Sequence, residues 1–145
     1  MAERRIAAAT PADMLLIEEC VRRFRLDDED LRPEQFVVVR EDDRIVAFGR
    51  IRPHGAVYEL GCVGVLEQER GRGLGALVVR ELVDRFPARE VYLTSDAPGY
   101  FERFGFQQIQ NAPAEIVAKI VRVCDRLRPG TVAMVLHRPT ARPSP

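Results

Sequence analysis

Residues 63–76 of this chain read VGVLEQERGRGLGA, an apolar alternation that runs into a turn rich in glycine and arginine. Apolar residues from the end of this turn onward recur at the spacing of an amphipathic helix: Leu74, Leu77, Val78, Leu82 and Val83. The stretch predicts a strand, a glycine loop and a helix in direct succession. Such a loop lets an anion approach backbone amides, and the helix N-terminus attracts negative charge. Arg70 and Arg72 add guanidinium groups suited to phosphate, so we expect a phosphate-containing ligand here.

The segments on either side of this loop predict a mixed sheet. Before the loop, strands separated by tight turns form an antiparallel meander at residues 36–40, 45–51 and 56–66. After the helix, residues 90–94 form a further strand, so that residues 56–94 make a strand–loop–helix–strand crossover. The predicted fold class is therefore α+β, an antiparallel meander followed by a strand–helix–strand unit in one mixed sheet.

The rest of the chain adds elements at both ends of this core. A short strand is expected at residues 4–9, and Thr10 caps a helix with Pro11 at its first position. Residues 27–30 are all acidic and predict a loop or helix start exposed to solvent. Later segments predict a short helix, a strand, a helix and a final strand, at residues 97–104, 106–110, 116–127 and 131–137. We expect one domain over residues 1–138 and a proline-rich tail over residues 139–145.

Composition excludes several classes of protein. The 145 residues carry 22 basic and 22 acidic side chains, a formal net charge of +0, which argues against a general nucleic-acid binder. No apolar run is long enough for a membrane span, and the first residues lack the apolar core of a signal peptide. Cys20, Cys62 and Cys124 lie in apolar contexts and are expected to be reduced core residues of a cytoplasmic protein, without a metal. All basic residues but Lys119 are arginines.

The glycine loop also matches a second kind of phosphate site. Gly71-x-Gly73-x-x-Ala76 satisfies the dinucleotide-binding fingerprint, and Asp96 lies 20 residues after Ala76, where that fingerprint requires an acidic residue. However, the loop follows an antiparallel meander rather than the first strand of a parallel sheet. The 69 residues after Ala76 are too few for the remaining strands of a dinucleotide domain.

Two segments instead resemble the GNAT superfamily of N-acetyltransferases. Arg70, Gly73 and Gly75 fit that family's acetyl-CoA motif, Arg/Gln-x-x-Gly-x-Gly/Ala. Residues 100–106, YFERFGF, resemble its later Phe-Tyr-Glu-Lys-x-Gly-Phe segment. The expected order of strands and helices is also similar to that of the family, so the resemblance extends over residues 4–137. It implies the acyl-CoA N-acyltransferase fold, with acetyl-CoA as co-substrate.

The resemblance also implies which residues hold acetyl-CoA. The loop would bind the pyrophosphate, and the strand before it would align the pantetheine arm. The implied cofactor-binding residues are Val63, Val65, Arg70, Gly71, Arg72, Gly73, Leu74, Gly75 and Ala76. The N–H near Val63 would polarise the thioester carbonyl and stabilise the oxyanion. Arg103 is a candidate for the 3′-phosphate.

Transfer of the acetyl group to an amine calls for a base, because most amines are protonated at neutral pH, and for an acid that protonates the departing thiolate. Glu59 is the candidate base by resemblance. On an ideal strand it shares a face with Val63 about 13 Å away, so a water relay or a bulge is required. Tyr100 is the candidate acid, ahead of Tyr92 and Tyr58. The family places its tyrosine one position later, where this chain has Phe101.

The acceptor stays open at this point. Residues 93–116 are weakly similar to the N-acetylglutamate synthase type and its small amino-acid-acetylating relatives, which favours a small or amino-acid-like primary amine. A substrate carboxylate would need an arginine, and candidates are Arg22, Arg23, Arg25 and Arg50. The acidic residues 27–30 favour a cationic amine or peptide instead. The alternatives are a protein or peptide amine, or an acyl-CoA sensor without turnover. We expect a monomer or homodimer with no nucleic-acid or membrane partner.

Overall fold

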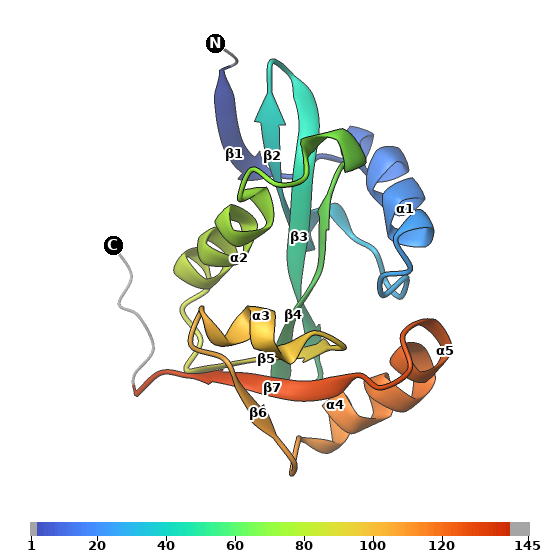
Figure 1. The fold of residues 1–145 in the computed structure, drawn as a ribbon, viewed down its shortest axis with the longest axis vertical. Helices are drawn as coiled ribbons and strands as arrows, with labels where there is room; N and C mark the ends of the chain where they lie inside the picture. Colours follow the sequence, from blue (N-terminus) through green and yellow to red (C-terminus); the bar gives the residue numbers. More distant parts are fainter. Residues whose placement is uncertain (1–2, 140–145) are drawn as a thin grey trace.

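The computed structural model describes residues 3–139, which form a seven-stranded mixed sheet in the order β1-β2-β3-β4-β5-β7-β6 (Figure 1). The strands are β1 (Arg4–Ala8), β2 (Phe36–Glu41), β3 (Arg44–His54), β4 (Val57–Val65), β5 (Glu90–Ser95), β6 (Gln107–Ile109) and β7 (Val132–His137). The α-helices are α1 (Met14–Arg23), α2 (Leu74–Arg85), α3 (Pro98–Glu102), α4 (Ala114–Lys119) and α5 (Asp125–Leu127). Strands β4 and β5 are parallel, and the other neighbours are antiparallel.

The predicted elements and the predicted fold class are confirmed. The meander, the crossover from β4 through α2 to β5 and the late strands lie within one or two residues of their expected bounds, except that β3 continues to His54, three residues beyond its expected end. The start of the first helix also agrees, since Thr10 and Asp13 form a reciprocal capping box around Pro11. The helix expected over residues 116–127 differs, because a π-helical turn at Ile120–Cys124 separates α4 from α5.

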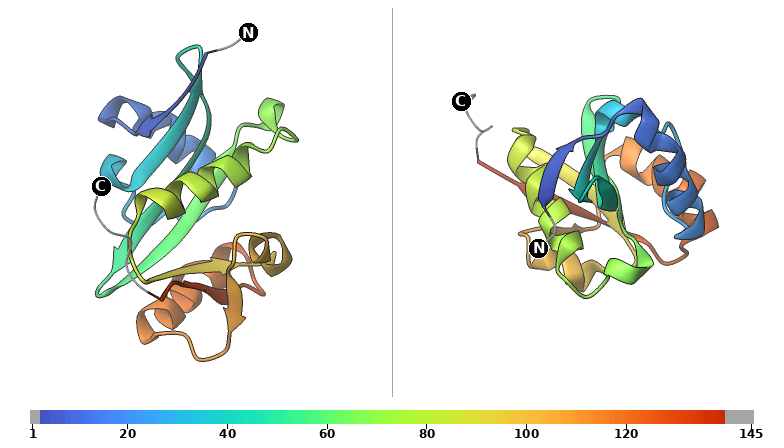
Figure 2. Two further views of the ribbon diagram at one scale, coloured as in Figure 1. Left: turned by 90° about the vertical axis from the view of Figure 1, so that its left-hand side faces the viewer. Right: turned by 90° about the horizontal axis from the view of Figure 1, so that it is seen from above.

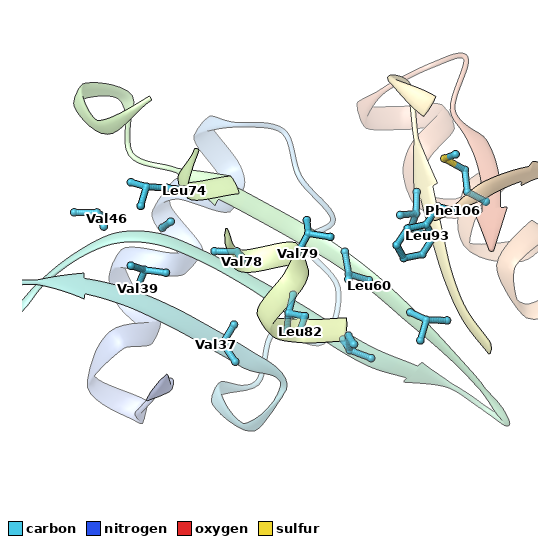
Figure 3. Close-up of a cluster of buried hydrophobic side chains, with 14 residues drawn as sticks. Val37, Val39, Val46, Leu60, Leu74, Val78, Val79, Leu82, Leu93 and Phe106 are labelled. Atoms are coloured by element: carbon cyan, nitrogen blue, oxygen red, sulfur yellow. The ribbon is translucent and has the colours of Figure 1, made fainter. Parts of the chain in front are cut away.

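Helices cover both faces of the sheet. Viewed from above, α2 and α3 lie on one face, whereas α1, α4 and α5 lie on the other (Figure 2). On the α2 face, Leu74, Val78 and Leu82 belong to one core cluster with Leu60 of β4, and the same cluster extends to Leu93 and Phe106 (Figure 3). This core joins the two halves of the sheet across the β4–β5 boundary.

On the opposite face, α1 packs through Ile17, Cys20 and Val21 against the meander. Cys20, Cys62 and Cys124 are all buried free thiols, as the sequence predicts. Burial raises the pKa of Cys62 to about 11, so this thiol stays neutral.

A β-bulge interrupts β4 beside the β4–β5 boundary. Phe48 pairs with Gly64 but Arg50 pairs with Gly61, so Cys62 and Val63 together oppose Gly49. Cys62 takes up the extra length in a left-handed conformation, with φ of 51°. The bulge overturns the expectation that Glu59 and Val63 share a face. Val63 packs on the α2 side, whereas Glu59 points to α4.

Strands β4 and β5 separate soon after they meet. Within residues 3–139 their register holds one aligned pair, Glu59 opposite Tyr92. Beyond this pair β4 enters its bulge, and no further residues of the two strands are paired in register within the described part of the chain. The two strands therefore diverge and leave an opening between them.

The acidic residues 27–30 are only in part the solvated turn that the sequence predicts, since Asp28 and Asp30 are exposed but Asp27 is not. The side chain of Asp27 is 8% exposed, and its carboxylate lies 2.8 Å from Arg52 and 3.3 Å from Arg50, which are both buried. One carboxylate of the acidic segment therefore lies inside the protein, because the buried guanidinium groups of Arg50 and Arg52 need a negative partner there.

No helix in residues 3–139 is long and apolar enough to cross a membrane. Of the proline-rich tail expected over residues 139–145, residues 140–145 lie outside the described part of the chain.

Candidate functional site

A cavity of about 220 Å³ occupies the opening between β4 and β5. Leu60, Gly61, Cys62 and Val63 line it from β4, and Leu93, Thr94 and Ser95 line it from β5. The segment after α1 and the α4–α5 segment close the other sides, with residues that include Leu26, Asp27, Lys119, Val123, Cys124 and Leu127. The walls are mainly apolar, and a few charged groups stand among them.

A second hollow of about 300 Å³ continues from this cavity to the glycine loop. The two share Leu26, Val63, Phe101 and Arg128 as lining residues. The second hollow then passes Gly64 and Val65 and ends at Arg70 and Gly75. A path thus runs from the start of α2, along the edge of β4, to the opening between the strands.

The glycine loop has the backbone that an anion site requires. Gly71 and Gly73 adopt positive φ angles of 84° and 78°, and both face open space at the position of a missing Cβ. Gly73 is the N-cap of α2, and no side chain caps it. The first N–H groups of a 12-residue helix therefore point at the loop, where a phosphate would satisfy them.

The two loop arginines lie in different environments. Arg70 donates from Nε to the carbonyl oxygen of Val65 at 3.1 Å, and its guanidinium stacks on Phe24 at 4.8 Å. Arg72 instead bonds two carboxylates, Glu69 at 2.5 Å and Glu41 at 2.7 Å. Arg70 therefore lines the path, whereas the charge of Arg72 is already neutralised within the protein.

The aromatic residues of α3 close one side of the path. Phe101 lines both hollows, at the place where the family has its tyrosine. Tyr100 lines only the hollow near the loop; its ring lies 5.0 Å from that of Phe101, and Arg103 stacks on it at 4.5 Å. The structure thus places the Tyr100 hydroxyl at the glycine-loop end of the path and the phenyl ring of Phe101 at the opening.

Glu59 lies beneath the cavity in a network of donors and is 2% exposed. Its Oε2 accepts hydrogen bonds from Lys119 Nζ at 2.6 Å and Thr94 Oγ1 at 2.7 Å, and its Oε1 lies 2.7 Å from His54 Nε2. Burial would raise the pKa of Glu59, but the hydrogen bond to His54 and the charge of Lys119 lower it to about 2. Glu59 is therefore ionised and does not itself line the cavity, while Thr94 and Lys119 do.

A set of arginines, which we call the arginine clasp, ties residues 24–30 to the α4–α5 segment over the cavity. Arg122 bonds Glu29 at 2.5 and 2.7 Å, and Arg126 bonds Asp28 at 3.0 Å. Arg128 donates to the carbonyl oxygens of Phe24 and Arg25, and Arg25 donates in return to that of Leu127. Segments about 100 residues apart in sequence therefore cover the opening together.

Sequence reasoning located the loop and β4 but missed several residues of the cavity. Thr94, Cys124 and Arg128 belong to elements that reach the opening only in the folded chain. Lys119 carries the one signal that was available, because it occupies an apolar helix position between Ile116 and Val123. A lysine in such a position is rarely buried without a charged partner.

The comparisons with known proteins agree with this geometry. The profile described as "Acetyltransferase (GNAT) family" matches residues 7–106, which contain the meander, the bulge, the glycine loop and all of α3. The chain belongs to this acetyltransferase family. No protein in the curated set matches the sequence.

Solved structures are similar to this GNAT acetyltransferase in fold at low sequence identity. N-acetylglutamate synthase from Neisseria gonorrhoeae, complexed with coenzyme A and N-acetyl-glutamate, is 18% identical with a TM-score of 0.77; the match covers 95% of this chain but 36% of the synthase. Rv2747 from Mycobacterium tuberculosis, in complex with CoA and NLQ, is 20% identical over 92% of this chain and 98% of its own, with a TM-score of 0.72. A GNAT family acetyltransferase from Brucella melitensis, in complex with acetyl-CoA, is 24% identical over 77% and 90%, with a TM-score of 0.56.

Proposed function

We propose that this GNAT acetyltransferase moves the acetyl group of acetyl-CoA to the primary amine of a small molecule. The observation that carries the proposal is the continuous path from the uncapped N-terminus of α2 to the bulge in β4. It offers a phosphate site at one end and unpaired strand backbone at the other, which is what an acyl-CoA requires.

In this proposal the pyrophosphate binds the amides of Gly71, Gly73, Leu74, Gly75 and Ala76. The guanidinium of Arg70 stands beside it, and Arg72 supports the loop through its two carboxylates. The pantetheine arm lies along the edge of β4 at Val63 and Val65, as an added strand does, beside the bond that Arg70 makes to the Val65 carbonyl oxygen. The N–H near Val63 then faces the thioester carbonyl, where negative charge develops as the amine attacks.

The acceptor amine enters the cavity between β4 and β5. Support for a small acceptor comes from the arginine clasp, because a cavity of about 220 Å³ closed on that side leaves little room for a folded protein surface. The charges at the wall are mixed, with Lys119 and Arg128 beside Asp27 and Asp96. A zwitterionic amine such as an amino-acid-like compound suits such a wall better than a compound with one charge.

Proton transfer in this proposal involves Glu59 and Tyr100 in different ways. Glu59 remains our candidate for the base through a relay, since Thr94 and Lys119 stand between its carboxylate and the cavity. Tyr100 remains the candidate acid, although a thiolate is a fair leaving group without help. We place the activity in the cytoplasm, with acetyl-CoA and the amine as partners, in a monomer or homodimer.

The experiment is a panel of amines incubated with acetyl-CoA while release of the CoA thiol is followed. We expect turnover with small amino-acid-like amines and little with peptides of the same N-terminal residue. Turnover with peptides alone would favour the alternative, acetylation of a protein amine. Binding of acetyl-CoA by calorimetry without turnover on any amine would favour a sensor domain.

A further inference from the structure

Lys119 lines the cavity that is proposed to receive the acceptor amine, and its own amine is bonded to groups in the cavity wall. Lys119 is the chain's one lysine, is 4% exposed and lines the cavity together with Val63 and Phe101. A lysine side chain carries the same functional group as the acceptor. Once neutral, it would compete with the acceptor for the acetyl group from inside the protein.

The π-helical turn contributes to this placement. Lys119 is the last residue of α4, and the turn Ile120–Cys124 follows it directly. In a regular α-helix a residue five positions later lies well off the same face, but the wider π turn brings it back to that face. Lys119, Val123 and Cys124 all line the cavity as a result.

The partners of Lys119 suit an ammonium group and not a neutral amine. Its Nζ donates to Glu59 Oε2 at 2.6 Å and to Thr94 Oγ1 at 2.7 Å, and it lies 3.5 Å from Asp27 Oδ2. The thiols of Cys62 and Cys124 also belong to the cavity wall, together with the charged groups of Arg25, Asp96 and Arg128. Asp27 also pairs with Arg50 and Arg52, so its charge is divided among three cations. Glu59 is nearer to Lys119 than Asp27 is and is therefore its main counterion.

We propose that the Glu59 carboxylate holds Lys119 as an ammonium ion and thereby prevents the protein from acetylating its own lysine. The inference rests on the proposed function, because it takes the acyl group to lie in this cavity. Glu59 then has a positioning and protecting role toward Lys119, separate from any role as base.

The opposing effects of burial and of nearby charges on the pKa of Lys119 also favour its ammonium form. Burial lowers the pKa of Lys119, but the charges of Glu59 and Asp27 outweigh it, and the pKa stays above its ordinary value. Without Glu59, the one carboxylate that still opposes the effect of burial on the Lys119 pKa is Asp27, which Arg50 and Arg52 share. The pKa of a buried lysine then falls by as much as about 3–5 units, which raises the neutral fraction at pH 8 by about 100-fold or more.

The reaction that Glu59 prevents is ordinary aminolysis. The neutral Nζ attacks the thioester carbonyl carbon, a C–N bond forms and the C–S bond breaks. CoA leaves as the thiolate and takes up the proton that the nitrogen loses. The product is an acetamide on Lys119, with a mass gain of about 42 Da that intact-protein mass spectrometry detects.

The test compares Glu59→Gln with the wild type during incubation with acetyl-CoA at about pH 8. We expect Glu59→Gln to gain one acetyl group on Lys119 at least about 100-fold faster than the wild type. The double variant Glu59→Gln, Lys119→Arg is the matched control and gains none, which also separates Lys119 from the N-terminal amine. Thr94→Val removes a hydrogen-bond partner but no charge, and stays unmodified.

Two further measurements keep the outcome decisive. Circular dichroism and CoA binding establish that Glu59→Gln is folded; if it is not, Glu59→Ala replaces it, because that change also removes the carboxylate. Acetic anhydride, which needs no CoA site, reports the reactivity of Lys119 even if the proposed function fails. Equal reactivity of Lys119 toward this reagent in the wild type and a folded variant overturns the inference.

Discussion

The hydroxyl of Tyr100 lies 3.3 Å from the point that a Cβ atom on Gly75 would occupy. Gly75 belongs to the first turn of α2, where the phosphate site is proposed, so the hydroxyl is aimed at the phosphate end of the path. A phenol in this position can donate a hydrogen bond to a phosphate oxygen. It stands farther along the path from the opening than Phe101 does.

Tyr100→Phe therefore distinguishes two roles. If the hydroxyl binds phosphate, we expect the KM for acetyl-CoA to rise about tenfold, since hydrogen bonds to charged groups contribute about 1.5–3 kcal/mol, while kcat changes little. Steady-state kinetics with acetyl-CoA as the varied substrate measures this. A fall in kcat at unchanged KM would instead support Tyr100 as the acid.

Gly73→Glu is expected to abolish binding of acetyl-CoA. The substitution places a side chain on a residue with φ of 78° and a negative charge beside the expected pyrophosphate. Calorimetric titration with CoA is the measurement. Gly130→Glu is the matched control, because Gly130 has φ of 85° and open space but lies outside the glycine loop. Equal loss of affinity in both variants would show that backbone strain, and not the loop, is responsible.

How far the sequence predicts this molecule depends on whether a feature is local. The glycine loop, the helix start at Thr10 and the meander follow from neighbouring residues, and the sequence predicts all of them. It offers a bulge only as an alternative to a water relay and does not locate it, because the left-handed residue is a cysteine and nothing in the sequence marks the extra length at Cys62. The pairing of Glu59 with Lys119 joins residues 60 positions apart, and no pattern in one sequence reports such a contact.

Acid is expected to destabilise the protein through Glu59. Its pKa is about 2 in the folded state against an ordinary value of 4.5, so its contribution is complete above pH 4.5 and is lost as the pH falls toward 2. The shift corresponds to about 3 kcal/mol. Urea unfolding at a series of pH values measures it. The difference in the free energy of unfolding between the wild type and Glu59→Gln should shrink as the pH falls from 4.5 to 2. Glu102→Gln, a control at an exposed position, should show the same pH dependence as the wild type.

The arginine clasp predicts a dependence on salt. Arg122 and Arg126 are both exposed, and each exposed ion pair contributes about 0.2–1 kcal/mol, which salt screens. Replacing both with glutamine should raise the KM for the acceptor up to about tenfold and leave the affinity for acetyl-CoA unchanged. High salt should bring the wild type close to the variant. If the clasp also excludes peptides, the variant acetylates them faster than the wild type does.

Gly64→Ala tests why β4 carries a glycine directly after its bulge. A Cβ at this position would stand 2.4 Å from Cζ of Phe48, a buried ring that packs against Phe36. Because that ring is enclosed in the core, it cannot move aside without cost, and we expect a loss of about 1–3 kcal/mol. Gly61→Ala is the control on the same strand, since nothing lies within 4 Å of its missing Cβ. Urea unfolding measures the stability of both variants. Equal stabilities would mean that the Phe48 ring can move aside for a Cβ at residue 64.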